Sequence, residues 1–187
     1  GVELPYIVRL ERGVINRGIY EIAVLHDGAD PSPFRSEIGW NEKAVLTFGG
    51  GCNVGYHQGD STARVLGDAI LSRGYAVVSN SLFVNDTNCS PIVAAETALM
   101  TKERLIETYG PLVHSIGSGG SGGAIMQYTI SQGYPGVLDG ILPSISFADA
   151  FSNVAPPDCL LLVTYLRTPS GSALTLEQRT AIGGHQL

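Results

Sequence analysis

The hydrophobic residues fall into short apolar runs that alternate with stretches in which they recur every three or four positions. Short runs rich in Val, Ile, Leu and Tyr predict strands, and the continuous run Lys43–Phe48 is typical of a strand buried on both faces. Turn-forming residues at 11–13 and 16–18 separate the first two runs, which predicts an N-terminal hairpin. The predicted strands are residues 6–10, 18–25, 43–48, 75–78, 111–116 and 137–142.

Helical spacing is clearest after residue 90. Pro91 is suited to the first turn of a helix, and Gly110 is suited to its end. The predicted helices are residues 61–72, 91–109, 122–132, 158–166 and 175–182. Because strands alternate with helices, the pattern predicts a mostly parallel sheet with helices on both faces.

A glycine-rich turn joins the fifth predicted strand to the helix that follows it. Its residues Gly119-Gly120-Ser121-Gly122-Gly123 fit the G-x-S-x-G pattern of a nucleophile elbow, in which a serine stands on a sharp strand-to-helix turn. Glycines two positions before and after the serine leave room where strand and helix nearly touch. The pattern predicts Ser121 as the nucleophile of an acyl transfer.

The same letters also fit a dinucleotide-binding motif, because residues 117–122 read G-x-G-x-x-G. That motif requires the first strand of its domain and an acidic residue near the end of the next strand. Here four predicted strands come first, and Asp139 falls inside the next strand. A plain glycine loop is the third interpretation, and the elbow is favoured over both.

An acyl-transfer serine also needs donors for the developing oxyanion. The amide of Gly122 directly follows the serine, and a second amide is offered by Gly50 or Gly51 after the strand Lys43–Phe48. We expect that strand to lie beside the elbow strand, so that the donors converge.

The base and the acid are harder to place. In this motif the acid and the histidine follow the serine; His185 is the single histidine after Ser121, and Asp149 or Asp158 is the available acid. A formal triad is Ser121, Asp149 and His185, but too few residues separate Ser121 from His185 for two further parallel strands. We therefore expect a second chain or a C-terminal segment to complete the fold and carry the base. His57, near the glycine triplet, is either a substrate contact or an exposed loop residue.

Composition narrows the class of protein. The chain has 187 residues, 44% hydrophobic residues and a formal net charge of -6. This predicts one domain: an edge hairpin and loop at 1–40, core βα units at 41–142, and the start of a lid or late region at 143–187. Apolar runs are too short to span a membrane and basic residues do not cluster, so neither a membrane span nor nucleic-acid binding is expected. No metal or cofactor is expected either.

The cysteines follow predicted strands. Cys52 and Cys89 come after two strands that should be neighbours, so they form either a disulfide that braces the glycine loop or two free thiols. Cys159 is left over, and is either buried or paired with something outside the chain. Three cysteines and few basic residues suit a secreted or periplasmic protein.

Together these motifs resemble a bacterial, largely uncharacterised family of α/β-hydrolases, similar in layout to tannase and feruloyl-esterase-like enzymes and polyhydroxybutyrate depolymerases. The matching residues are Glu11-Arg12-Gly13, Asn16-Arg17-Gly18, Phe48-Gly49-Gly50-Gly51-Cys52, Ala95-Glu96-Thr97, Lys102-Glu103-Arg104, Gly120-Ser121-Gly122-Gly123-Ala124, Tyr134-Pro135-Gly136-Val137-Leu138-Asp139-Gly140 and Asp158-Cys159. The resemblance implies an exported protein longer than this chain, with Ser121 as nucleophile.

The sequence therefore predicts a serine hydrolase that cleaves carboxylic esters, small or polymeric, through an acyl-enzyme on Ser121. Two other classes stay open: a non-catalytic binding protein with the same fold, and a dinucleotide-binding oxidoreductase.

Overall fold

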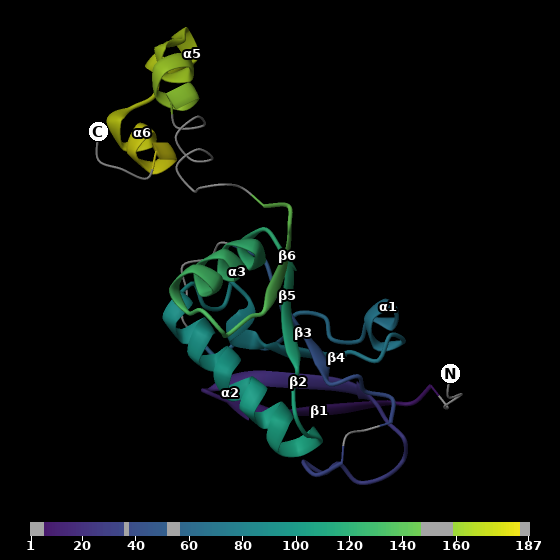
Figure 1. Cartoon of the computed structure of the whole chain (residues 1–187). Helices are drawn as coiled ribbons and strands as arrows, with labels where there is room; N and C mark the ends of the chain where they lie inside the picture. Colours follow the sequence, from purple (N-terminus) through teal and green to yellow (C-terminus); the bar gives the residue numbers. More distant parts are fainter. Residues whose placement is uncertain (1–5, 36–37, 52–56, 147–158, 184–187) are drawn as a thin grey trace. The chain divides into compact units, whose positions relative to one another are not determined.

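Six strands form one mixed sheet in the order β1-β2-β4-β3-β5-β6 (Figure 1). The computed structural model of the chain describes residues 6–35, 38–51, 57–146 and 159–183. It divides into two compact units, residues 1–146 and 147–187, and the first holds the whole sheet. The strands are β1 Val8–Ile15, β2 Gly18–Leu25, β3 Lys43–Phe48, β4 Ala76–Asn80, β5 His114–Gly120 and β6 Gly140–Ser144.

Strand β2 runs in the direction opposite to the other five strands of the sheet. Strand β2 is antiparallel to both β1 and β4, whereas β4, β3, β5 and β6 run parallel to one another. The carboxyl ends of the four parallel strands therefore meet at one edge, and the turn between β1 and β2 lies at that same edge because Tyr20 pairs with Asn80. The predicted α/β layout is confirmed.

The hairpin turn is tighter than predicted. Strand β1 continues to Ile15, so residues 11–13 belong to the strand and the prediction of a turn there is wrong. Glu11 is held in the strand because its carboxylate accepts hydrogen bonds from Tyr20 and Arg104. The turn itself consists of Asn16 and Arg17, which have φ values of 51° and 68°. Two positive φ angles in succession match the twist of a two-residue hairpin.

Helices cover both faces of the sheet (Figure 1). Helix α2 (Pro91–Tyr109) has the bounds that the sequence predicts, with the Ser90 hydroxyl accepting from the Val93 amide and Gly110 at φ 108°. Helix α3 (Gly122–Gly133) lies with α2 on one face, and the short α1 (Asp68–Leu71) lies on the other. A 3-10 turn, η1 (Ser81–Phe83), follows β4.

The helix predicted at residues 61–72 is reduced to α1. The Thr62 hydroxyl donates to the Glu21 carboxylate, which ties the segment to β2. Val65 is buried in a small cluster with Ala23, Leu71 and Val77. These tertiary contacts hold residues 61–67 in a non-helical path across the sheet, overriding a weak helical propensity.

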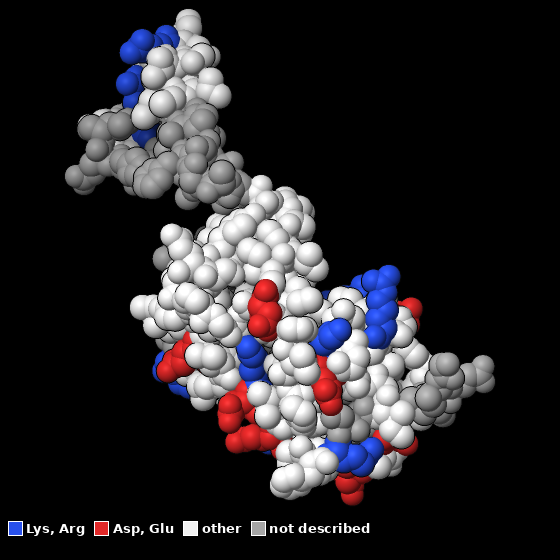
Figure 2. Space-filling view, in the orientation of Figure 1, with Lys and Arg blue, Asp and Glu red and all other residues white. Residues whose placement is uncertain are grey.

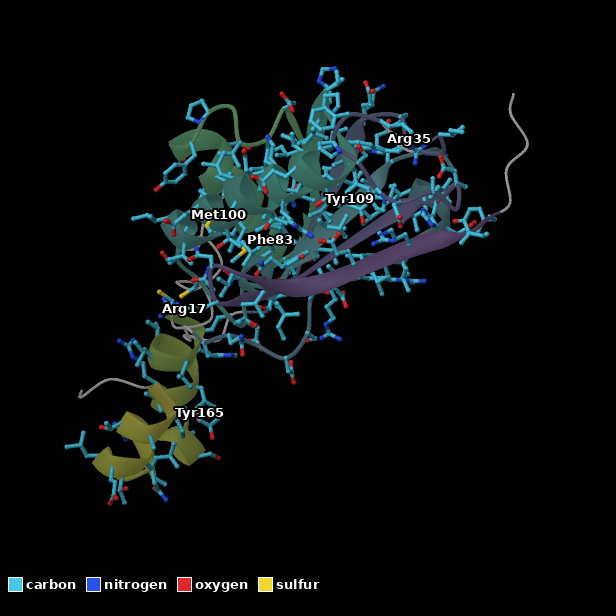
Figure 3. The ribbon with its side chains drawn as sticks, turned by 90° about the horizontal axis from the view of Figure 1, so that it is seen from below. Arg17, Arg35, Phe83, Met100, Tyr109 and Tyr165 are labelled. Carbon is cyan, nitrogen blue, oxygen red and sulfur yellow. The ribbon has the colours of Figure 1, made fainter. Side chains whose placement is uncertain are left out.

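The two faces of the sheet build separate cores, because alternate residues along a strand point to opposite sides. Ile22 and Val78 face α2 and α3 in the larger core, whereas Ala23 and Val77 face α1 in the smaller one. The larger core also encloses Tyr109 and Phe83, both labelled in Figure 3.

A charged cluster links β1 and β2 to α2. The Glu11 carboxylate accepts from the Tyr20 hydroxyl (2.7 Å), the Arg104 Nε (2.7 Å) and the Tyr109 hydroxyl (3.1 Å). Burial alone would raise the pKa of Glu11, but the hydrogen bonds from Tyr20 and Arg104 and the charge of Arg104 together lower it below its ordinary value. Burial and the negative charge of Glu11 raise the pKa of Tyr109 to about 12.

The second unit is helical in its described part. Its elements are η2 Leu160–Thr164, which is π-helical, the 3-10 turn η3 Tyr165–Arg167, α5 Pro169–Ser172 and α6 Leu176–Gly183. These cover the two helices that the sequence predicts near the end. None of the helices in the described ranges combines the length and the apolar composition that a membrane span requires.

Candidate active site

Ser121 stands on the turn between β5 and α3. Its backbone has φ 55° and ψ −122°, a conformation that non-glycine residues rarely adopt. The Ser121 carbonyl accepts from the amides of Ala124 (2.9 Å) and Ile125 (3.2 Å), which begins the helix. A serine in this position normally caps the helix with its hydroxyl, but here the side chain makes no capping hydrogen bond. The predicted strand-to-helix turn is present, and its serine hydroxyl is not used to build it.

Glycines surround the turn because other backbone segments approach it closely. A Cβ on Gly123 would lie 2.6 Å from the carbonyl oxygen of Phe48, and one on Gly122 would lie 2.4 Å from that of Gly51. A Cβ on Gly119 would meet the Phe48 oxygen at 2.3 Å. Each distance is below van der Waals contact with rigid backbone, so the G-x-S-x-G spacing reflects packing between β5, α3 and the end of β3.

A buried glutamine braces the turn from inside. The Gln127 side-chain amide donates to the carbonyls of Gly119 (3.1 Å) and Gly123 (2.9 Å), and its oxygen accepts from the Leu142 amide (3.2 Å). The Ser121 amide donates to the Ser144 carbonyl (3.1 Å), so β6 also holds the turn. The sequence pattern does not single out Gln127. Its signal was a single polar residue on the otherwise apolar and small-residue face of the helix.

The glycine triplet at residues 49–51 lies directly beside Ser121, since β3 pairs with β5. A Cβ on Gly50 would be 3.4 Å from the Ser121 Cβ and 3.9 Å from the Gly122 nitrogen. The carbonyls of Gly49 and Gly50 accept from the amides of Asn85 (3.1 Å) and Asp86 (3.2 Å), which follow β4.

Those hydrogen bonds fix which way the triplet presents its amides. In a trans peptide the N–H points opposite to the preceding C=O. Because the Gly49 and Gly50 carbonyls point to the β4 side, the N–H groups of Gly50 and Gly51 point away from β4, to the side on which β5 and Ser121 lie. The amide of Gly122 is the first of helix α3 and has no acceptor within the helix.

Asn85 and Asp86 are site residues that the sequence did not single out. The Asn85 side-chain amide donates to the Gly51 carbonyl (2.8 Å). A Cβ on Gly51, which has φ 100°, would lie 2.9 Å from an Asp86 carboxylate oxygen. The asparagine-rich loop after β4 was their signal, and its role is to hold the glycine triplet in place.

Apart from Asp86, which lies against Gly51, the surroundings of Ser121 carry almost no charge. Between residues 111 and 146 the sequence has one charged side chain, Asp139. Figure 2 shows the corresponding surface over α3 and β6 as largely free of coloured charged groups. The remaining electrostatic feature is the amino end of α3, whose unpaired N–H groups favour negative charge next to Ser121.

A second cluster of reactive side chains lies at the opposite end of β5. The Lys102 ammonium donates to the Ser115 hydroxyl (3.0 Å), and that hydroxyl donates to the Asp139 carboxylate (2.9 Å). Burial lowers the pKa of Lys102, and hydrogen bonds from Ser115 lower that of Asp139. Ser115 is completely buried, so substrate cannot reach it. This cluster joins α2, β5 and the start of β6 and is structural.

The three described histidines lie away from Ser121. His114 begins β5 at the opposite end from Ser121, and His26 follows β2 at that same far edge. His57 lines a cavity with the hairpin turn of β1 and β2, three strand positions from β5. Asp149, Asp158 and His185 fall outside the described residues.

The predicted disulfide is not formed. Cys89 is a free, exposed thiol, and Cys159 is also free and exposed. Strands β3 and β4 are neighbours as predicted, but the loop that contains Cys89 is instead held by backbone and asparagine hydrogen bonds, such as that from the Asn88 side chain to the Leu82 carbonyl. Cys52 lies outside the described residues.

The fold and this turn define a class: an α/β protein with a serine on a strained strand-to-helix turn beside a glycine loop. The chain belongs to the Tannase-like family of unknown function (DUF6351), whose family model matches residues 1–187. No match was found among curated proteins.

Proposed function

We propose that the protein is a serine hydrolase that cleaves carboxylic esters, with Ser121 as nucleophile. The observation that carries this proposal is the positive φ of Ser121 between β5 and α3, with Gly50 in contact with the turn. Such strain persists where surrounding structure maintains it, and it is concentrated at functional sites. The tannase-like character of the family agrees with an esterase.

An α/β-hydrolase fold accounts for the arrangement. The strand order β1-β2-β4-β3-β5-β6, with β2 antiparallel and the serine directly after β5, supports it. In this fold the nucleophile stands above the carboxyl edge of the sheet, which is where Ser121 lies.

The chemistry proceeds in two steps. The Ser121 oxygen attacks the ester carbonyl carbon while a base takes the hydroxyl proton, and the alcohol leaves with that proton as the acyl-enzyme forms. Water, deprotonated by the same base, then attacks the acyl carbon and releases the acid and Ser121. The amides of Gly122 and of Gly50 or Gly51 donate to the oxyanion in both steps.

The base and acid come from outside the described residues. His26 and His114 lie at the opposite edge of the sheet and His57 lines the cavity beside the hairpin turn, so the candidates are Asp149 with His185, or a second chain or C-terminal segment that completes the sheet beyond β6. Export to the periplasm or the medium remains part of the proposal, as the sequence predicts.

Dinucleotide binding fits the site less well. The acidic residue that such a motif requires would be Asp139. Asp139 directly precedes β6, at the edge of the sheet opposite Ser121, and its carboxylate accepts a hydrogen bond from the Ser115 amide (2.7 Å). A binding protein that does not turn over substrate would have the same fold. Only the chemical reactivity of Ser121 distinguishes it from a hydrolase.

A fluorophosphonate probe tests the assignment. We expect the protein to be labelled, Ser121→Ala to lose all labelling, and Ser144→Ala, which changes an exposed serine beside the turn, to be labelled as the unaltered chain is. Labelling that persists in Ser121→Ala refutes the nucleophile. An unaltered protein that is never labelled favours the binding protein.

A further inference from the structure

Strand β1 is the outermost strand at one edge of the sheet, and its free side is regular (Figure 1). The Ile7 carbonyl accepts from the His26 amide (2.8 Å), so the backbone of Ile7 and of every second residue after it pairs with β2. The intervening residues direct their backbone N–H and C=O groups outward; they are Val8, Leu10, Arg12 and Val14. Among the described residues of the first unit, no hydrogen bond from another segment reaches these outward groups.

Strands at the edge of a sheet usually carry a feature that blocks pairing with another strand. At the opposite edge, β6 is five residues long and contains Pro143, which has no N–H to donate. Strand β1 is eight residues long and contains neither proline nor lysine. Its inward-pointing carboxylate, Glu11, is already paired with Arg104 (2.7 Å), so a strand added beside it would bury no unpaired carboxylate. Of the two edges, β1 is therefore the one suited to pairing.

Exposed apolar side chains flank this edge on both faces of the sheet. Val8 packs in the smaller core and Ile15 against the larger one, so even-numbered residues face α1 and odd-numbered residues face α2. On the α1 face, the exposed apolar side chains are Tyr6, Leu10 and Val14. On the α2 face, Ile7 is 51% exposed. A strand of a second molecule, added to this edge, would cover all of them.

The charges of β1 select one symmetric register for two copies of the strand. In a continuous antiparallel sheet, a two-fold axis places one residue directly opposite its own counterpart. An axis at Arg9, Glu11 or Arg12 would set two like charges against each other, which is destabilising. An axis at Leu10 sets leucine against leucine and Arg9 opposite Glu11 of the second copy.

The same register brings the exposed apolar side chains of the α1 face together. Tyr6 lies opposite Val14 of the second copy, and Leu10 lies opposite its counterpart. The outward backbone groups also match, because each residue with outward N–H and C=O groups then faces another such residue. The register that avoids like charges is therefore also the one that pairs the exposed apolar residues.

A groove on the α2 face receives a further side chain in this register. It has a volume of about 440 Å³, and its lining residues are Ile15, Leu99, Met100, Glu103, Arg104 and Glu107. Ile7 of the second copy lies opposite Gly13 and diagonally across from Ile15, one wall of the groove. By symmetry, the exposed Ile7 of each copy lies beside the groove of the other.

We propose that two copies of this chain associate through β1, forming one antiparallel sheet across a two-fold axis at Leu10. Residues 6–14 of each copy make the interface. Ser121 follows β5, with β2, β4 and β3 between that strand and the β1 edge, so the association does not involve the proposed nucleophile.

Sedimentation equilibrium of the 187-residue chain measures the association. We expect a concentration-dependent dimer whose dissociation constant rises at least about tenfold in Leu10→Lys, because like charges meet at the axis and the leucine pair is lost. Leu142→Lys is the matched control, since Leu142 is an exposed leucine on β6 at the opposite edge; this variant should leave the dimer intact. Circular dichroism checks that both variants fold.

Cysteine cross-linking tests the register. In a chain whose three cysteines are replaced by serine, Leu10→Cys places two thiols opposite each other, with Cα atoms about 5.5 Å apart, a distance that a disulfide spans. The two copies of residue 14 would lie ~27 Å apart along the strands. We expect Leu10→Cys to form a covalent dimer on oxidation and Val14→Cys to stay unlinked.

Three results would overturn the inference. The first is a chain that sediments as a monomer throughout the accessible concentration range. The second is a dimer that Leu142→Lys disrupts and Leu10→Lys does not, which would place the contact at β6. The third is equal cross-linking of Leu10→Cys and Val14→Cys, which would exclude this register.

Discussion

Five described residues other than glycine have a positive φ, and Ser121 and Arg17 are two of these, at the same edge of the sheet. Ser121 has φ 55° and Arg17 has φ 68°. Neighbouring glycines relieve steric conflict, whereas these two residues create strain. At the scale of single residues, a side chain at either position therefore costs stability relative to glycine.

Substitution of the serine should reveal this conflict. Ser121→Gly relieves the positive φ, whereas Ser121→Ala keeps the strain and removes only the hydroxyl. We expect Ser121→Gly to be more stable than Ser121→Ala by about 1 kcal/mol in the free energy of unfolding. Urea denaturation of both variants measures the difference, and equal stability would show that the turn carries no strain.

The glycines of α3 are not equivalent. A Cβ on Gly123 would lie 2.6 Å from the Phe48 carbonyl oxygen, whereas one on Gly133 meets nothing within 4 Å. We expect Gly123→Ala to lower the free energy of unfolding by about 1–3 kcal/mol, because rigid backbone must shift. Gly133→Ala in the same helix should be neutral or stabilising by up to about 1 kcal/mol. Thermal and urea unfolding of the two variants measure these effects. Similar effects of Gly123→Ala and Gly133→Ala would contradict the close packing of Gly123 against the Phe48 backbone.

At the scale of elements, hydrogen bonds between side chains fix how the hairpin meets α2. Glu11 on β1 joins Tyr20 on β2 to Arg104 and Tyr109 on α2. The Asn16 side chain joins the hairpin turn to the same helix. The edge of the sheet is thus attached to α2 at the hairpin turn and midway along the strand pair.

The Glu11 cluster makes stability depend on pH. Because the folded-state pKa of Glu11 is lowered, its contribution is present above the pKa of an unfolded glutamate and is lost as pH falls through the folded-state pKa. We expect Glu11→Gln to cost about 1–2 kcal/mol at neutral pH, and the difference from the unaltered chain to shrink over that acidic window.

Glu103→Gln is the matched control, since Glu103 is exposed on the same helix. It should leave stability within about 0.5 kcal/mol of the unaltered chain at neutral pH. A Glu11→Gln difference that persists unchanged into acid would show that packing rather than charge is responsible.

At the scale of the whole molecule, the first unit contains the buried core. Every buried hydrophobic residue of the described chain lies before residue 139. One face of β5 and β6 nevertheless remains partly open, with Leu142 exposed beside a cavity of about 190 Å³ that Val45 and Ile116 also line.

This distribution predicts that residues 1–146 fold alone. We expect a chain ending at Ser146 to keep the far-UV circular dichroism of a mixed sheet and to unfold cooperatively within a few degrees of the full chain. The full chain under the same conditions is the control. Loss of cooperative unfolding would show that the second unit supplies part of the core, and aggregation of a folded product would show that the open face needs a cover.

The local sequence pattern was sufficient to predict those elements whose signals lie close together in the sequence. The bounds of α2 were predicted from Pro91 and Gly110, and the turn at Ser121 was predicted from its glycine spacing. These predictions succeeded because capping and tight turns depend on a few consecutive residues. The neighbouring positions of β3, β4 and β5 also followed, since parallel strands in such sheets have few possible orders.

Tertiary structure decided what depends on residues far apart in sequence. The lengths of β1 and α1 changed because Glu11 and Thr62 are held by distant partners, and no local pattern records those contacts. Gln127, Asn85 and Asp86 became site residues only when folding brought them to the glycine turn. The strain at Ser121 and Arg17 belongs to this group as well, because a positive φ is maintained by packing around the residue and not by the residue itself.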